Sequence, residues 1–211
     1  MKDKKLLSDI KEYLKCYEDQ VLEDWYELIR HISVSETGEG IETCCDWIQK
    51  KMEEIGIQVT KYSVKPAPVL VGRFGNDPEK KTVLIYAHYD VKPAGERKLW
   101  HSDPFVPTVS DGKVYARGSA DNKSLMAHLK ALEYFIRRKM EVPVNVIFVF
   151  EGDEECGSRG LEEFLAEHRT ELAADLVFFS DGPKDPSGLP IIALGAKGDL
   201  SIHITVEKMN R

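Results

Sequence analysis

One histidine and several carboxylates in this sequence come after short apolar runs or at a helix start. They are His88, Asp90, Asp121, Glu154, Glu155 and Asp181. The apolar runs cover residues 82–87, 144–150 and 176–179, and short runs of this kind, bounded by turn residues, predict buried strands. Ligand sites in open α/β sheets form at the carboxyl ends of such strands. The spacing therefore predicts that these side chains converge on one edge of a sheet.

The chemistry that this set of side chains favours is metal-assisted hydrolysis. Neutral imidazole and carboxylate oxygens are ligands for ions of the zinc and manganese classes. Asp90 lies on the same side of an extended segment as His88, so it can accept the second ring N–H and fix the tautomer. The adjacent carboxylates of Glu154 and Glu155 point in different directions, so a metal can hold one while the other moves protons. A bound metal would polarise a carbonyl and activate a water.

Each of these residues also has a purely structural interpretation. His88 could be a hydrogen-bonded histidine at a strand end, and Asp121 could cap a helix. The pair Glu154-Glu155 could belong to a solvated acidic loop, and Asp181 could be an ordinary turn residue. Surface or packing roles are predicted for His31, His101, His128, His168 and His203, with His101 the best of them for substrate contact because it lies in a long loop.

The elements that must position these residues follow from hydrophobic periodicity. Helical spacing predicts helices over residues 6–32 (one or two helices), 41–55, 122–138 and 161–168. Strands are predicted over residues 59–64, 69–74, 82–87, 144–150 and 176–179, with a hairpin around Ser110-Asp111-Gly112. This order predicts a three-layer α/β fold with a mostly parallel or mixed central sheet. Two more strand patterns, over residues 190–194 and 200–206, follow.

Composition excludes several classes of function. The net charge of −7 argues against a nucleic-acid partner, and no apolar stretch approaches the roughly 20 residues needed to span a bilayer. The cysteines, Cys16, Cys44, Cys45 and Cys156, form no Cys-x-x-Cys unit, so we expect reduced thiols and a cytoplasmic location. No Gly-x-Ser-x-Gly, P-loop or Gly-x-Gly-x-x-Gly motif occurs.

The motifs resemble the M20-type metallopeptidase family of carnosinases, PepV-type dipeptidases, aminoacylases, carboxypeptidase G2 and succinyl-diaminopimelate desuccinylase. The resemblance covers about residues 10–211. It is carried by Ala87-His88-Tyr89-Asp90-Val91, by residues 100–104, by residues 115–123 (Tyr-Ala-Arg-Gly-Ser-Ala-Asp-Asn-Lys), by residues 151–158 (Glu-Gly-Asp-Glu-Glu-Cys-Gly-Ser) and by Ser180-Asp181-Gly182. It implies a zinc-exopeptidase-like catalytic domain with a two-metal site, usually zinc, with manganese or cobalt as alternatives.

The resemblance also implies a role for each residue. His88 and Asp181 would bind one metal, Asp121 would bridge both, and Glu155 would bind the second. Glu154 would be the general base and Asp90 would orient His88, while no substrate-binding residue is assigned. The peptide bond between Asp121 and Asn122 would be cis.

The resemblance further implies hydrolysis of a peptide bond in dipeptides or short peptides. Asp181, where some relatives have Glu, favours the dipeptidase branch; the alternative is an amidohydrolase acting on N-acyl amino acids. Family members are longer, with an inserted lid and one more histidine ligand. Residues 1–196 would thus be the catalytic domain without its C-terminal segment, and residues 197–211 the first strand of a truncated lid or dimerisation domain.

A third reading, from a different class, is a metal-binding fragment without turnover. On this reading the chain would bind at most one metal well, through His88, Asp121 and Asp181, and would be nearly inactive. Exposed apolar surface and an open strand edge would then favour formation of a homo-oligomer or low stability.

Overall fold

The computed structural model describes residues 2–182, together with residues 185, 187, 189, 191–192, 198 and 202–206. The chain divides into two compact units, Met1–Asp181 and Gly182–Arg211. Every helix and strand named below belongs to the first unit.

A five-stranded mixed sheet forms the centre of the first unit. Its strand order is β1 (Gln58–Tyr62), β2 (Val69–Phe74), β6 (Asn145–Glu151), β3 (Thr82–His88) and β7 (Leu176–Phe179). The pairs β1–β2 and β2–β6 are antiparallel, whereas β6, β3 and β7 run parallel to one another. In the β3–β6 ladder His88 lies opposite Glu151, so the two strands end level with each other. The predicted mixed α/β sheet is confirmed.

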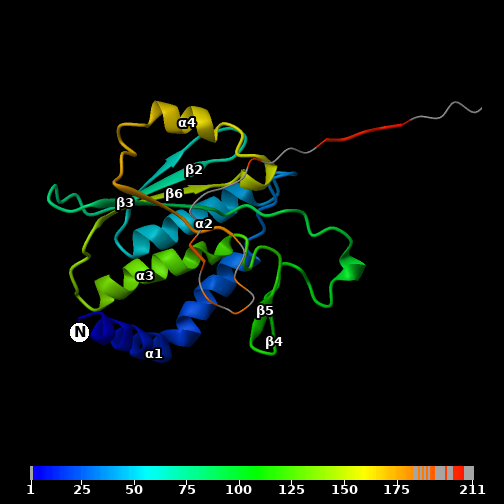
Figure 1. Ribbon diagram of the computed structural model, residues 1–211. Coiled ribbons are helices and arrows are strands. Elements are labelled where there is room, and N and C mark those ends of the chain that lie inside the picture. The colour runs from blue at the N-terminus through cyan, green and yellow to red at the C-terminus, as the bar shows by residue number, and fades with distance from the viewer. Residues whose placement is uncertain are drawn as a thin grey trace, which may run out of the picture. The chain divides into compact units, whose positions relative to one another are not determined.

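Helices cover both faces of this sheet and make it the middle of three layers (Figure 1). The helices α2 (Ile41–Glu54) and α3 (Met126–Arg137) lie on one face, and α4 (Leu161–Glu167) lies on the other. Strand β6 is apolar along most of its length and buried at all seven positions, as expected for a strand covered on both faces. Phe148 and Phe150 pack towards α2 and α3, while Ile147 and Val149 join Phe164 of α4.

The first helix, α1 (Lys2–Arg30), is one continuous helix of 29 residues, which decides between the two predicted alternatives. Its carboxyl-terminal half reaches the core, where Leu28 is fully buried. Asp24 pairs with Lys51 of α2 and Lys130 of α3, so one carboxylate ties three helices together.

Two connections differ in detail from the sequence expectations. The helix predicted from residue 122 begins instead as a short 3-10 turn, η2 (Lys123–Leu125), before α3 starts at Met126. The long polar loop contains a second 3-10 turn, η1 (Arg97–Leu99), and is held together by ion-paired hydrogen bonds between Arg97 and Asp103. The predicted hairpin is present as β4 (Thr108–Ser110) and β5 (Lys113–Tyr115).

The strand patterns near residues 190–194 and 200–206 fall partly outside the described residues. Those that are described, 191–192 and 202–206, belong to no strand. Among the described residues, no strand pairs with residues 191–192 or 202–206, and a β-strand needs a paired neighbour for its backbone groups. The boundary predicted at residue 196 therefore stays a prediction. Within the described part of the chain, no helix has both the length and the apolar character needed to cross a membrane.

Candidate metal centre

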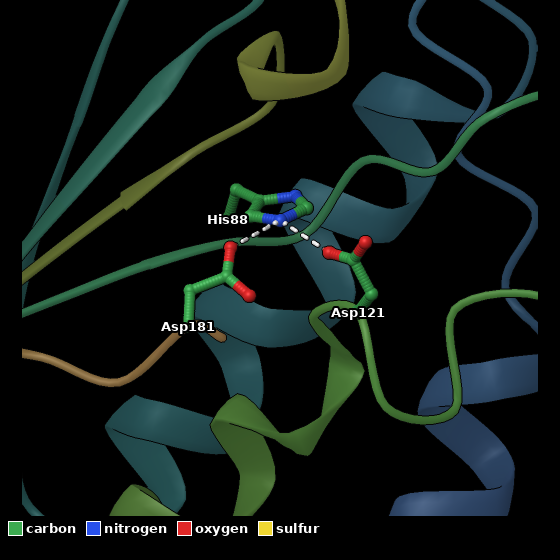
Figure 2. A group of neighbouring side chains, drawn as sticks. All are labelled: His88, Asp121 and Asp181. Atoms are coloured by element: carbon green, nitrogen blue, oxygen red, sulfur yellow. Dashed lines mark hydrogen bonds and ion pairs between the residues drawn. The ribbon is translucent and has the colours of Figure 1, made fainter. Parts of the chain in front are cut away.

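Three side chains from three separate elements meet at the carboxyl edge of the sheet (Figure 2). His88 is the last residue of β3, Asp181 follows β7 by two residues, and Asp121 lies in the loop before η2. The Nε2 atom of His88 lies 3.0 Å from Oδ1 of Asp121 and 3.2 Å from Oδ2 of Asp181. One potential ligand atom from each residue lies within 4.8 Å of the others. The predicted convergence of these three residues is confirmed.

The loop that carries Asp121 is held against the residues that precede Asp181. The Asp121–Asn122 peptide bond is cis, as the family resemblance implies. Asn122 is fully buried, and its side-chain amide donates a hydrogen bond of 3.3 Å to the backbone oxygen of Ser180. The interpretation of Asp121 as a helix cap is wrong, because Asn122 and Leu125 occupy the capping positions of η2 and α3.

Asp90 is fully buried and connects His88 to the acidic pair. Its Oδ1 lies 3.2 Å from Nδ1 of His88. The same carboxylate accepts hydrogen bonds of 3.1 Å from the backbone N–H groups of Glu154 and Glu155. These two residues open the 3-10 turn η3 (Glu154–Cys156) that follows β6. Asp90 therefore fixes the histidine ring and the start of the acidic turn at once.

The acidic turn is not a solvated loop. The side chain of Glu155 is 12% exposed and that of Glu154 is 35% exposed. Asp153 is buried and accepts two hydrogen bonds from the Arg159 guanidinium. Glu151 is also buried and accepts hydrogen bonds from the hydroxyls of Tyr86 and Ser158. Each carboxylate of this stretch therefore has a defined place, which sequence spacing could not show.

Electrostatics mark the edge of the sheet as a cation site. Burial alone would lower the pKa of His88, but nearby carboxylates outweigh it and raise that pKa to about 9. These carboxylates belong to Asp90, Glu154 and Asp181. The pKa of Glu154 is also raised, first by burial and then, against the opposing effect of His88, by nearby carboxylates. The excess of carboxylates over cations would stabilise a bound divalent ion.

Glu154 lies at the rim of the three-residue group, and Glu155 lies apart from it. The Oε2 atom of Glu154 is 3.7 Å from Nε2 of His88. Glu155 instead faces Lys92, whose ammonium lies 3.4 Å from its Oε2 and also contacts its backbone oxygen. Sequence analysis did not single out Lys92; its position two residues after Asp90 was the only available signal.

The donor set fits a divalent metal of the zinc class. One imidazole nitrogen and two carboxylate oxygens, held by three segments of chain, are ligands that such an ion takes. Asp90 contacts the other ring nitrogen of His88, an arrangement typical of metal-binding histidines. The roles of the individual residues as ligands remain predictions.

The other described histidines have packing or surface environments, as expected. His31 lies against Trp47, His128 meets the edge of Phe178, and His168 pairs with Glu171. His101 and His203 are exposed. None of the five belongs to the group formed at the sheet edge.

Comparison with known proteins agrees with this geometry. The family described as Peptidase family M20/M25/M40 matches residues 84–209, which include all six predicted site residues. The chain belongs to this family. Since its members are metallopeptidases, the family implies divalent metal ions at the edge of the sheet.

Two curated relatives of this M20 chain are dipeptidases. The Cys-Gly metallodipeptidase dug1 of Schizosaccharomyces pombe is 40% identical over 164 residues, which are 74% of this chain and 34% of that protein. The Beta-Ala-His dipeptidase of Mus musculus is 37% identical over 143 residues, which are 66% of this chain and 29% of that protein. The chain thus spans about a third of the length of these relatives.

Solved structures show the same fold. Human carnosine dipeptidase 1 superimposes with a TM-score of 0.80 at 29% identity, covering 83% of this chain and 41% of that one. An M20 family metallo-carboxypeptidase, Sso-CP2 from Sulfolobus solfataricus, gives a TM-score of 0.75 at 36% identity and covers 80% of this chain and 38% of that one. The catalytic-domain fold predicted from the sequence is confirmed.

Proposed function

We propose that this chain carries the metal centre of a dipeptidase that hydrolyses the peptide bond of dipeptides or short peptides. The observation that supports it most directly is the group of His88, Asp121 and Asp181, with the carboxylate of Glu154 at its rim. The curated relatives with dipeptidase names support a small peptide as substrate. Zinc is the proposed metal, with manganese or cobalt as alternatives, because a site of one imidazole and two carboxylates suits all three.

The residues of this chain divide the work of hydrolysis among them. A bound metal supplies a Lewis acid for the scissile carbonyl and lowers the pKa of a water. His88, Asp121 and Asp181 would hold the metal, with Asp121 as the bridging ligand when two metals are bound and Glu155 as a ligand of the second. Glu154 would take the proton of the attacking water and pass it to the leaving amine. Asp90 would keep the ring of His88 oriented.

The test compares the wild type with Glu154→Gln in the protein as it is naturally expressed. We expect turnover of Cys-Gly or β-Ala-His dipeptides by the wild type, and a loss of about 10²–10⁴-fold in kcat for Glu154→Gln. Metal content, measured by mass spectrometry of the purified proteins, should be equal in both. Equal turnover by the two proteins would contradict the role of Glu154.

Two alternatives remain as outcomes of the same test. An amidohydrolase would cleave N-acetyl amino acids faster than dipeptides, so the wild type is also assayed with N-acetyl amino acids. A metal-binding module would retain the metal and cleave neither class. The absence of bound metal in the wild type would contradict all three readings. The cytoplasmic location expected from four free thiols stays a prediction.

A further inference from the structure

We propose that the connector between α1 and α2, residues 31–40, and the side chain of Lys123 together brace the metal centre, with Ser35 and Lys123 as the positioning side chains. The brace touches the segment of His88, the turn of Asp121 and the turn of Glu154. It deepens the proposed function and rests on it, because it concerns the geometry of the same group.

The first contact of the brace fixes the segment that carries His88. Ser33 is fully buried, and its hydroxyl donates a hydrogen bond of 2.7 Å to the backbone oxygen of Tyr89. The backbone N–H of Val91 donates a bond of 2.8 Å to the backbone oxygen of Ser33. Ser33 thus holds the backbone on both sides of Asp90.

The second contact runs through the Ser35 hydroxyl. Ser35 is 8% exposed, its side chain lies beside the Asp90 carboxylate, and its hydroxyl oxygen accepts a hydrogen bond of 3.5 Å from Sγ of Cys156 in the acidic turn. Asp90 in turn contacts His88 and the backbone N–H of Glu154. The Ser35 hydroxyl therefore lies between the acidic turn, which it contacts at Cys156, and the carboxylate that orients the histidine ring.

The third contact ties the turn of Asp121 to the end of α1. Lys123 is fully buried, and its ammonium donates a hydrogen bond of 3.0 Å to the backbone oxygen of Leu28 and another to that of His31. These oxygens belong to or adjoin the last turn of α1, where unpaired carbonyls and the helix dipole favour a cation. Lys123 lies two residues after Asp121, so a shift of this side chain would move the carboxylate.

A purely stabilising role for these side chains makes a different prediction from a positioning role. A side chain that only stabilises would lower the melting temperature on removal and leave the affinity for metal unchanged. Removing a positioning side chain would lower the affinity for metal, because groups that orient metal ligands typically contribute 10–100-fold to that affinity. The two roles are therefore distinguished by comparing the metal affinity of variants that lose the same amount of stability.

The experiment measures Zn²⁺ binding by calorimetry, together with melting temperature, for two matched sets of variants. Ser35→Ala is compared with Thr37→Ala, since the hydroxyl of Thr37 bonds only within the connector, to the backbone of Val34 and Glu39. Ser35→Thr keeps the hydroxyl. Lys123→Met is compared with Lys130→Met, because Lys130 is also a poorly exposed lysine that reaches α1 but pairs with Asp24, away from the metal centre.

We expect Ser35→Ala and Lys123→Met to weaken Zn²⁺ binding by about 10–100-fold. Ser35→Thr, which keeps a hydroxyl, should retain the wild-type affinity for Zn²⁺. Both control variants should retain it as well. Wild-type affinity in Ser35→Ala would overturn the brace, as would equal losses in the test and control variants. If Lys123→Met does not fold, the Ser35 set decides alone. A wild type that binds no Zn²⁺ would instead refute the proposed function, and the brace with it.

Discussion

At the scale of single residues, the candidate centre depends on side chains that serve more than one partner. Asp90 contacts the imidazole of His88 and two backbone N–H groups with a single carboxylate. Glu155 shows the opposite case, because the carboxylate expected at the second metal is paired with the ammonium of Lys92. The Glu155 carboxylate can therefore pair with the ammonium of Lys92 or bind a second metal ion.

Replacing Lys92 should strengthen the binding of a second divalent ion. The ammonium lies 3.4 Å from the Glu155 carboxylate and is 53% exposed, so solvent screens much of its effect. Unit charges about 4 Å apart interact by about 1 kcal/mol in bulk water, so Lys92→Gln should raise the second-ion affinity several-fold. Calorimetric titration with Mn²⁺ checks this. The control, Lys98→Gln, removes an exposed lysine from the same loop, and a gain of the same size there would contradict the prediction.

At the scale of elements, the carboxyl-terminal half of α1 is fastened by an ion cluster. Asp24 bonds Lys51 of α2 and Lys130 of α3, and Glu133 bonds Lys130 and Arg137. The brace on the metal centre begins at the end of the same helix.

Asp24→Asn should destabilise the fold in a pH-dependent way. Burial would raise the pKa of Asp24, but the pairs with Lys130 and Lys51 outweigh it and lower that pKa below 3.8. A carboxyl group with a depressed pKa in the folded state stabilises above the unfolded pKa, and loses this effect as the pH falls through the folded value. Loss of the charge should lower the free energy of unfolding by about 1–3 kcal/mol at pH 7.

Urea unfolding of the wild type and Asp24→Asn at pH 7 and pH 3 measures this difference. We expect the gap in free energy of unfolding to shrink at pH 3, because this pH lies below the ordinary aspartate pKa, so the unfolded chain binds a proton that the folded carboxylate binds less readily. Asp19→Asn, an exposed aspartate on the same helix, should leave the free energy unchanged at both values. A gap that is the same at both pH values would contradict the ion-pair explanation.

At the scale of the whole molecule, the described sheet ends in an exposed apolar strand. β7 is the last strand in the sheet order, and all four of its residues are exposed. Leu176 and Val177 are 57% and 60% exposed, although the strand pairs with β3 of the main sheet. An apolar edge of this kind offers unpaired backbone groups to another chain.

We therefore expect the 211-residue chain to associate through β7. Light scattering should give a mass above that of the monomer, and Val177→Lys should return it towards the monomer, because a charged residue on an edge strand opposes pairing. Val109→Lys is the matched control, since Val109 is an equally exposed valine on β4. A wild type that is monomeric at high concentration would contradict this prediction.

The sequence alone was sufficient for the sheet and for the residues that converge on its edge. Apolar runs such as residues 82–87 and 144–150 become strands because burial on both faces selects an apolar pattern, which is local. Parallel strands then bring their carboxyl ends to one edge, so the meeting of His88 and Asp181 follows from topology. Asp121 was placed with them because it lies where a loop enters a helix, and the family resemblance added its role as a bridging ligand.

Only the tertiary structure decided how those residues are supported. The placement of Ser35 beside Asp90, and the hydrogen bonds of Lys123 to the end of α1, join positions 55 or more residues apart in the chain. The pairing of Glu155 with Lys92 is equally non-local. The start of η2 after Asn122 rather than after Asp121 depends on backbone geometry. Hydrogen bonds to backbone oxygens leave no pattern of residue types, because every residue has such an oxygen.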